Sequence, residues 1–281
     1  FVYHNFFKNI FPVLSVYYFN KVYVELNQIS LTERCTLRCK KCAHACGYVD
    51  RQKDDMNLKK VYLTADTYFK NVGYTREFVL IGGEPLLYKE LNEVVEYIGE
   101  NYRDKIGIFS ITTNGTILPS ETLLELCKKY EVTFRISNYS KAVPRLKEKY
   151  NIWENLLKSN DIFYTIQSEN NEWFDYGFDY LKRAENEEEL VEVFDECKTP
   201  CSEVRENRFY FCVMARSVSE NMRLNVGKTD YLDLKSLNGD EGKKEFLEYT
   251  MGYSDKGYLD MCRYCHGADV VNYKIKAAEQ F

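Results

Sequence analysis

The 281-residue sequence has no block of basic residues and no strong excess of charge of either sign. Its 38 lysines and arginines are interspersed with 43 aspartates and glutamates, which gives a net charge of −5. Proteins that bind nucleic acid or anionic lipid usually present a basic face. Nothing in this charge pattern predicts such a face, so we expect neither nucleic acid nor a membrane as a partner.

The sequence also lacks a recognisable export signal, an internal repeat and a long linker. Its first 19 residues are apolar and aromatic, but Lys8, Asn9 and Pro12 interrupt them, and no basic start or small-residue cleavage site is present. We interpret residues 1–20 as a packing segment, and a helix lying on a membrane surface is the alternative. Ten cysteines without an export signal indicate metal ligation in a reducing compartment. We therefore expect a cytoplasmic protein.

Strand-like runs alternate with helical runs through the first two thirds of the chain. The helical runs keep a period of 3.6, as in Leu91, Val94, Val95 and Ile98. The strand-like runs cover residues 22–29, 78–81, 106–112, 132–136 and 162–166. This alternation predicts an α/β fold, a partial (β/α)6 barrel similar to a TIM barrel, over residues 21–195. Residues 196–281 are predicted to form a small cysteine-rich module.

Three cysteines, Cys35, Cys39 and Cys42, lie in the run CTLRCKKC just after the first predicted strand. Three thiolates at this spacing can bind three irons of a four-iron, four-sulfur (4Fe-4S) cluster, which leaves the fourth iron without a protein ligand. Zinc is the alternative, because Cys39-x-x-Cys42 also has zinc spacing and Cys46 would complete a four-thiolate site.

Three more motifs follow successive predicted strands, where the carboxyl ends of barrel strands build an active site. They are Gly82-Gly83-Glu84-Pro85, Thr112-Thr113-Asn114-Gly115 and Ser137-Asn138. With the cysteine triplet, they make about half of the chain resemble the radical S-adenosylmethionine (SAM) enzymes. A zinc site has no use for the Gly-Gly-Glu-Pro turn. The chain departs from the family at Lys41, where an aromatic residue or histidine usually precedes the third cysteine, and this puts a side-chain contact to adenine there in doubt.

The resemblance implies that the open iron binds the amino and carboxylate groups of SAM. It also implies that Gly82, Gly83, Glu84 and Pro85 bind the methionine amino group. Contacts to the methionine or ribose would come from Thr113, Asn114, Ser137 and Asn138, for which loop capping is the alternative. The implied chemistry is reductive cleavage of SAM to a 5'-deoxyadenosyl radical, with a flavodoxin or ferredoxin as electron donor.

A second set of cysteines lies near the end of the chain: Cys197, Cys201, Cys212, Cys262 and Cys265. Nine residues separate Cys197 from Asn207, and four more precede Cys212. This spacing resembles the SPASM or twitch auxiliary-cluster pattern, with Asn207 in place of a turn glycine. Cys262 and Cys265 would complete a second 4Fe-4S site, and zinc is again the alternative.

Five cysteines for four positions leave one thiol over. If Cys197 is a ligand, the spare thiol is Cys201, which would then return a hydrogen atom to a substrate radical, as an epimerase requires. Cys46 is a second candidate donor. Alternatively Cys201 is the ligand and Cys197 the spare, or the spare is inert. Cys127 lies on the apolar face of a predicted helix, and we expect it in the core.

Two outcomes of hydrogen abstraction remain open, oxidation (a dehydrogenase) and epimerisation. The barrel and the module use nearly all of the chain, so we expect no separate domain for a leader peptide and favour a small carbohydrate-like or aminoglycoside-like substrate. A ribosomally made peptide is the second candidate. The aromatic stretch at residues 170–180 either lines the barrel mouth or is a surface loop. The alternative of another class is a non-catalytic zinc or iron-sulfur protein.

Overall fold

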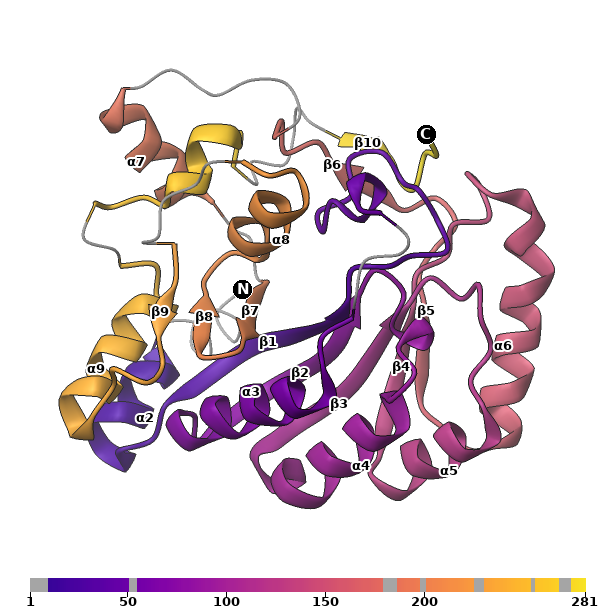
Figure 1. Cartoon of the computed structure of the whole chain (residues 1–281), viewed down its shortest axis with the longest axis horizontal. Coiled ribbons are helices and arrows are strands. Elements are labelled where there is room, and N and C mark those ends of the chain that lie inside the picture. The colour runs from indigo at the N-terminus through magenta and orange to yellow at the C-terminus, as the bar shows by residue number, and fades with distance from the viewer. Residues whose placement is uncertain are drawn as a thin grey trace.

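The computed structural model describes residues 10–50, 55–178, 186–197, 201–224, 230–253, 256–267 and 274–281. Residues 1–9 of the predicted packing segment therefore lie outside the described residues. The chain folds around one eight-stranded sheet with the order β5-β4-β3-β2-β1-β7-β8-β9 (Figure 1). Its five consecutive parallel strands are β1 (Tyr23–Thr32), β2 (Tyr74–Gly82), β3 (Ile106–Thr113), β4 (Val132–Ile136) and β5 (Tyr164–Ile166).

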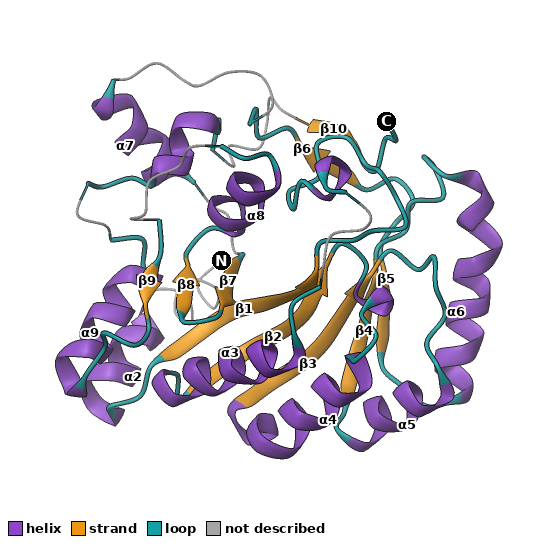
Figure 2. Cartoon of the chain, in the orientation of Figure 1, coloured by secondary structure: helices purple, strands orange, loops and turns teal. Residues whose placement is uncertain are grey.

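Four helices cover the outer face of these strands (Figure 2). They are α3 (Leu58–Asn71), α4 (Leu91–Tyr102), α5 (Glu121–Lys129) and α6 (Lys147–Ser159). Side-chain caps fix where two of them begin: Asn57 accepts a hydrogen bond from the Lys59 amide, and Ser120 accepts one from the Leu123 amide. The apolar stripe of each helix packs on the sheet, and Cys127 of α5 is buried there, as expected.

The two faces of the sheet differ in chemistry. Side chains that point to the helices are large and apolar, among them Phe78, Phe109 and Phe134. Because paired residues of parallel strands point to the same side, the opposite face is the one that carries Glu77, Ser110 and Arg135. The inner face of the partial barrel is therefore polar at its centre.

The prediction of an α/β partial barrel is confirmed. The sixth parallel strand, β7 (Ser202–Arg205), pairs with β1 rather than with β5. Two short antiparallel strands, β8 (Arg208–Tyr210) and β9 (Leu232–Asp233), extend the sheet beyond it. The Ser202 hydroxyl donates to the carbonyl of Leu26 at 2.6 Å, which helps to fix β7 against β1.

A second, smaller core lies above the inner face (Figure 1). It includes α7 (Glu187–Glu196), α8 (Val213–Asn221) and the 3₁₀ helix η6 (Asp260–Tyr264). Beside this core, β6 (Glu172–Phe174) pairs with β10 (Lys274–Lys276). Helices α2 (Phe11–Phe19) and α9 (Gly239–Thr250) pack together near the start of β1. Because β7 to β9 extend the barrel sheet, the module boundary at residue 196 stays a prediction.

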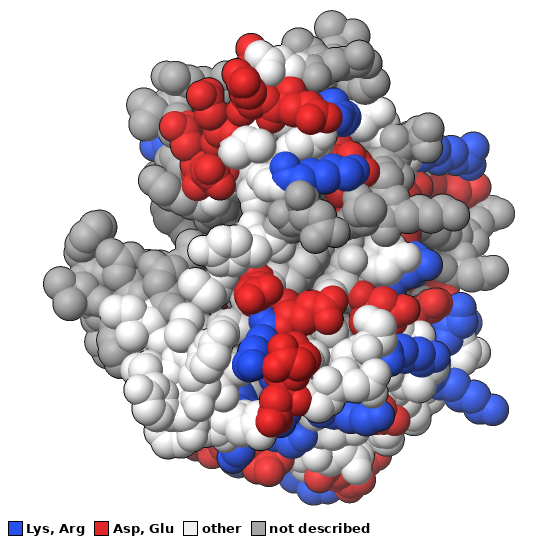
Figure 3. Space-filling view, turned by 90° about the vertical axis from the view of Figure 1, so that its left-hand side faces the viewer, with Lys and Arg blue, Asp and Glu red and all other residues white. Residues whose placement is uncertain are grey.

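The aromatic stretch at residues 170–178 links the two cores, and Tyr180 lies outside the described residues. Trp173 packs partly buried against the main core, with its ring 5.6 Å from that of Tyr139, and Tyr176 packs against the second core. On the face shown in Figure 3, acidic side chains gather where α7 lies, and charges of both signs mix below. None of the described helices has both the length and the apolar composition needed to cross a bilayer.

Candidate active site

The loop after β1 carries Cys35, Cys39 and Cys42 above the carboxyl edge of the sheet. Cys39 is buried, the other two are partly buried, and all three are free thiols. Burial raises the pKa of Cys35 to about 11 and that of Cys39 to about 12, and the charges of the neighbouring thiols add to both shifts. The three sulfurs therefore share one poorly solvated site, which a bound cation or cluster would stabilise in the thiolate form.

The Gly-Gly-Glu-Pro turn packs directly against the start of this loop. A Cβ on Gly82, whose φ is 145°, would lie 2.2 Å from the Thr32 carbonyl oxygen, and one on Gly83 would lie 2.2 Å from that of Arg34. The Gly83 amide donates to Thr32 at 2.8 Å, and the Glu84 amide donates to Arg34 at 2.9 Å. Both glycines are thus required to bring the turn beside Cys35.

Glu84 is fully buried at the base of this site. Its carboxylate accepts hydrogen bonds from the Thr113 hydroxyl at 2.7 Å, the Asn114 amide at 2.9 Å and the Leu86 amide at 3.2 Å. Burial raises the pKa of Glu84 to about 7, against the effect of these donors. No ion-pair partner of Glu84 is found among the described residues. A buried carboxylate without a cation is the group that an incoming ammonium would satisfy.

The asparagines of the motifs after β3 and β4 have different hydrogen-bond partners. The Asn114 side chain donates to the Cys35 sulfur at 3.5 Å, so it reaches the cysteine loop. The Asn138 side chain accepts from the amide and the hydroxyl of Ser140, at 3.0 and 2.7 Å, and so caps its own turn. The Ser137 amide donates to the Thr113 carbonyl at 2.9 Å. Pro85 is buried and begins a 3₁₀ helix, Pro85–Leu87.

Residues around the third cysteine have structural partners of their own. Lys41, the residue that departs from the family pattern, forms an ion pair with Asp175 at 3.1 Å. Both Cys42 and Cys46 are free thiols, and a hydrogen bond from the Cys46 thiol lowers the pKa of Cys42 to about 7. His44 is partly buried as a residue, and desolvation of its ring together with nearby Arg216 lowers its pKa to about 4, so the ring is neutral.

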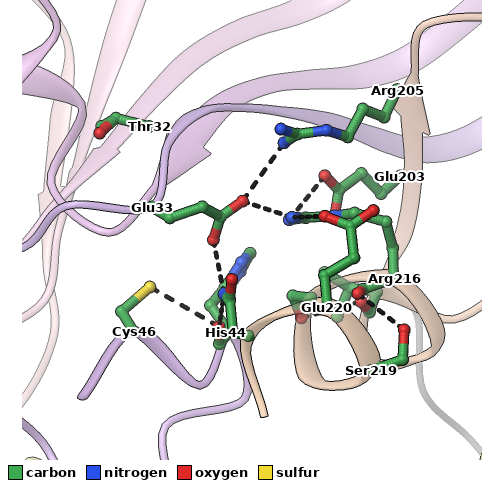
Figure 4. Close-up of polar contacts among 12 residues, drawn as sticks. Thr32, Glu33, His44, Cys46, Glu203, Arg205, Arg216, Ser219 and Glu220 are labelled. Atoms are coloured by element: carbon green, nitrogen blue, oxygen red, sulfur yellow. Dashed lines mark hydrogen bonds and ion pairs between the residues drawn. The ribbon is translucent and has the colours of Figure 1, made fainter. Parts of the chain in front are cut away.

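A buried ion-pair network connects the start of the cysteine loop to helix α8 and strand β7 (Figure 4). The guanidinium of Arg216, on α8, is fully buried and bonds to the carboxylates of Glu33 and Glu203. On the same helix, Asn221 donates to the His44 carbonyl at 2.8 Å and Ser217 donates to that of Ala43 at 3.1 Å. Helix α8 thus fixes the backbone just after Cys42. Sequence reasoning missed this network, because its members lie far apart in the chain.

Four of the five later cysteines line one small pocket. They are Cys197, Cys212, Cys262 and Cys265, and apolar side chains such as Phe194, Met214 and Met261 make most of the remaining wall. Burial raises the pKa of Cys212 and of Cys262, the latter to about 12. This is the set that the sequence predicts when Cys197 is taken as a ligand.

Asp230 supports this pocket, and the sequence gives no signal for its role. Its carboxylate accepts from the backbone amides of Asp260 at 2.6 Å and Met261 at 2.8 Å. These amides begin η6, which carries Cys262, and a carboxylate is favourable at a helix N-terminus. Burial raises the pKa of Asp230 to about 6.

Cys201 is the cysteine of this set that does not line the pocket. Burial raises the pKa of its thiol, while nearby Arg135 acts in the opposite direction and Glu77 in the same one. Arg135 and Glu77 form an ion pair on the inner face of the sheet. The Cys201 side chain packs at the edge of the second core, and the Cys201 carbonyl accepts a hydrogen bond from the Val213 amide at 3.0 Å. The charges of Arg135 and Glu77 on the inner face of the sheet also reach its thiol.

The donor sets suit iron-sulfur clusters. Among the described residues, no three His, Cys, Asp or Glu side chains converge on a point where one metal ion would bind. A cluster does not need such convergence, since each thiolate binds a different iron. Three thiols beside a buried carboxylate fit a cluster that holds SAM, and the four-thiol pocket has the ligand count of a fully coordinated cluster.

Comparison with known proteins concerns the segment of the chain that carries the first of these sites. Residues 29–139 match the Radical SAM superfamily. The chain is 37% identical over 101 residues to molybdenum cofactor biosynthesis protein 1 of Dictyostelium discoideum, which covers 36% of this chain and 15% of that one. It is 32% identical over 120 residues to GTP 3',8-cyclase of Microcystis aeruginosa, which covers 42% and 34%. The matched segment is thus at most about a third of these relatives.

One solved structure is similar over nearly the whole chain. BtrN, in complex with AdoMet and 2-DOIA, has a TM-score of 0.54 with 14% sequence identity, over 92% of this chain and 97% of that one. At this identity the likeness concerns the fold. Residues 29–139 form a radical SAM domain, and its cofactors are a 4Fe-4S cluster and SAM.

Proposed function

We propose that this protein is a radical SAM enzyme that oxidises a small polar substrate. The observation that carries the proposal is the convergence of Cys35, Cys39 and Cys42 with the buried carboxylate of Glu84. The three thiols would hold the cluster, and Glu84 would bind the amino group of SAM. Asn114, which already donates to Cys35, would hold the cysteine loop in a fixed position relative to the loop after β3. SAM bound there would supply a 5'-deoxyadenosyl radical that removes one hydrogen atom from the substrate.

A second 4Fe-4S cluster in the pocket of Cys197, Cys212, Cys262 and Cys265 would make the reaction an oxidation. After hydrogen abstraction, the substrate radical must lose one electron and one proton to become a carbonyl or imine. The four cysteines would hold a cluster able to take up that electron, and a basic group or water would take the proton. The surrounding apolar wall would limit the contact of a bound cluster with water, and solvent exposure is one of the properties that set a cluster's potential.

The inner face of the sheet supports a polar substrate. Glu77 and Arg135 lie at its centre, and the side chain of Arg135 is 42% exposed. Two buried hydroxyls on the same face, Ser30 and Ser110, have no hydrogen-bond partner among the described residues. A substrate rich in hydroxyl or amino groups would satisfy such groups, and BtrN, of similar fold, is solved with AdoMet and 2-DOIA. The GTP 3',8-cyclase matches cover the radical SAM part alone and give no argument for a nucleotide.

Epimerisation is the second candidate, favoured by the position of Cys201. Its thiol does not line the four-thiol pocket, and the charges of Arg135 and Glu77 on the inner face reach it. From there it would return a hydrogen atom to the substrate radical and become a thiyl radical, which an external reductant must restore. A ribosomal peptide remains the alternative substrate. A flavodoxin or ferredoxin would deliver the first electron in the cytoplasm, where ten free thiols stay reduced.

The test is an anaerobic reaction of purified protein with SAM and a strong reductant. The wild type should form 5'-deoxyadenosine, and Cys39→Ala should form none. Cys127→Ala is the matched control, because Cys127 is a core thiol far from both sites in the fold, and it should retain the activity. Absence of 5'-deoxyadenosine from an iron-loaded wild type would refute the proposal. With the substrate in heavy water, deuterium at a carbon of the product would favour epimerisation over oxidation.

A further inference from the structure

Residues 277–281 lie across the cysteine loop, and we call this segment the strap. Cys39 and Gln280 form an antiparallel β-bridge. The Lys40 amide donates to the Glu279 carbonyl at 2.7 Å, and the Phe281 amide donates to that of Arg38 at 2.9 Å. The strap directly follows β10, which pairs with β6, so it reaches the loop from a fixed strand. It is thus held at both ends.

Side chains reinforce these backbone contacts. The Phe281 ring lies so close to Gly47 that a Cβ there would be 2.7 Å from it, and it meets the Tyr48 ring edge-on at 5.3 Å. Ala278 is fully buried in the main core. The strap therefore covers the loop on the side of Cys39, whose exposed fraction is 7%.

Gln280 places its carboxamide on the Cys39 sulfur, with Nε2 at 3.1 Å. The orientation of the amide follows from its other contacts. Oε1 accepts from the Arg38 amide at 2.9 Å, and Nε2 also donates to the Ala278 carbonyl at 2.7 Å. A flipped amide would set its NH₂ against the Arg38 N–H and its oxygen against the Ala278 carbonyl. The N–H group must therefore face the sulfur.

We propose that Gln280 is a positioning residue that raises the reduction potential of the SAM-binding cluster through its hydrogen bond to Cys39. This inference rests on the proposed function, because it takes Cys39 as an iron ligand. An N–H donor stabilises negative charge on a thiolate, and the reduced cluster carries more of that charge than the oxidised one. Hydrogen bonds to the sulfurs are among the factors that set cluster potentials. Asn114 makes the corresponding contact to Cys35 from the barrel side.

The first experiment is a redox titration of the reconstituted protein, followed by the EPR signal of the reduced cluster. Gln280→Leu keeps most of the side-chain volume but removes both donors, and the midpoint potential should become more negative. Gln280→Glu keeps an acceptor for Arg38 and should shift it in the same direction. Glu279→Gln is the matched control, since it loses only an exposed ion pair with Lys40, and it should leave the potential unchanged. A potential equal to wild type in Gln280→Leu and in Gln280→Glu would overturn the inference.

The second experiment needs no cluster. In the metal-free protein, Cys39 should react with iodoacetamide several-fold more slowly in Gln280→Leu than in wild type or Glu279→Gln, as read by mass spectrometry. The backbone hydrogen bonds still hold the strap in this variant, but the N–H group that stabilises the thiolate is lost. Cys35 provides the internal reference and should not change. An unchanged Cys39 rate would show that the Gln280 N–H group does not stabilise negative charge on the Cys39 sulfur. The two proposals can fail separately. Absence of a cluster from the wild type would refute the proposed function. A cluster whose midpoint potential is unchanged by the Gln280 substitutions would refute this inference alone.

Discussion

The guanidinium of Arg216 forms an ion pair with the carboxylate of Glu33 that is almost completely shielded from water. Arg216 is on α8, directly after the pocket cysteine Cys212, and Glu33 follows β1 at the start of the cysteine loop. The pair therefore joins the two cysteine sites through one short path. A buried charge that loses its partner is strongly destabilising.

Arg216→Met should lower the free energy of unfolding by about 3–5 kcal/mol, because Glu203 would remain buried without its ion-pair partner and Glu33 would keep only the partly exposed Arg205. Arg205→Met is the matched control. Arg205 bonds to the same Glu33 oxygen at 3.3 Å but is partly exposed, so its loss should cost much less. Denaturant unfolding of the metal-free variants measures both. Equal effects of the two substitutions would show that burial of the pair is not what matters.

Acid should weaken the same pair. Burial disfavours ionisation of Glu33, but Arg216, Arg205 and Asn221 outweigh it and lower the pKa of Glu33 from 4.5 to about 2. A carboxylate with a lowered pKa in the folded state contributes stability that is complete above pH 4.5 and is lost as the pH falls through about 2.

Glu84 should have the opposite pH dependence. Burial raises its pKa from 4.5 to about 7, so the folded protein binds a proton that the unfolded chain has released. The stability of the metal-free protein should therefore fall as the pH rises from 4.5 to 7, by up to about 3 kcal/mol from this residue.

Glu84→Gln, which cannot ionise, should lose that part of the pH dependence. Urea unfolding of both proteins at pH 5 and pH 8 provides the comparison, and wild type should lose more stability than the variant between these values. Identical losses would mean that Glu84 is already ionised at pH 5. SAM, by supplying an ammonium to the carboxylate, should reduce the loss in the wild type.

Cys197 and Cys201 should differ in their effect on iron content. Cys197 lines the four-thiol pocket and Cys201 does not, so Cys197→Ser should lose iron from the second site while Cys201→Ser retains it. The two cysteines are close in sequence, which makes each the control for the other. Loss of iron in Cys201→Ser with retention in Cys197→Ser would reverse the ligand assignment.

Local patterns in the sequence predicted much of the fold. The strand at residues 132–136 has the predicted bounds, since five residues between two helical runs leave little freedom. β1 extends to Thr32, past the predicted end at residue 29, because Ser30 and Thr32 are buried despite their polarity. β7 beside β1 could not be predicted, because the pairing of strands that lie far apart in the chain leaves no local period.

The candidate site also contains residues that the sequence predicts and residues that it does not. The cysteine triplet, Glu84 and Asn114 follow strands whose ends meet, so their convergence was predictable from spacing. Gln280 contacts Cys39 across 241 positions and Arg216 contacts Glu33 across 183, and neither residue belongs to a motif. Their roles depend on the tertiary structure alone.

The most direct test of the central claim is the content of iron and sulfide in protein purified without oxygen. Two four-iron clusters predict about eight irons per chain, about four in a Cys35→Ala/Cys39→Ala/Cys42→Ala variant, and 5'-deoxyadenosine formation in the wild type alone. About four irons in the wild type and none in the triple variant would show that the second cysteine set binds no cluster. Zinc in place of iron at both sites, with no cleavage of SAM, would contradict it.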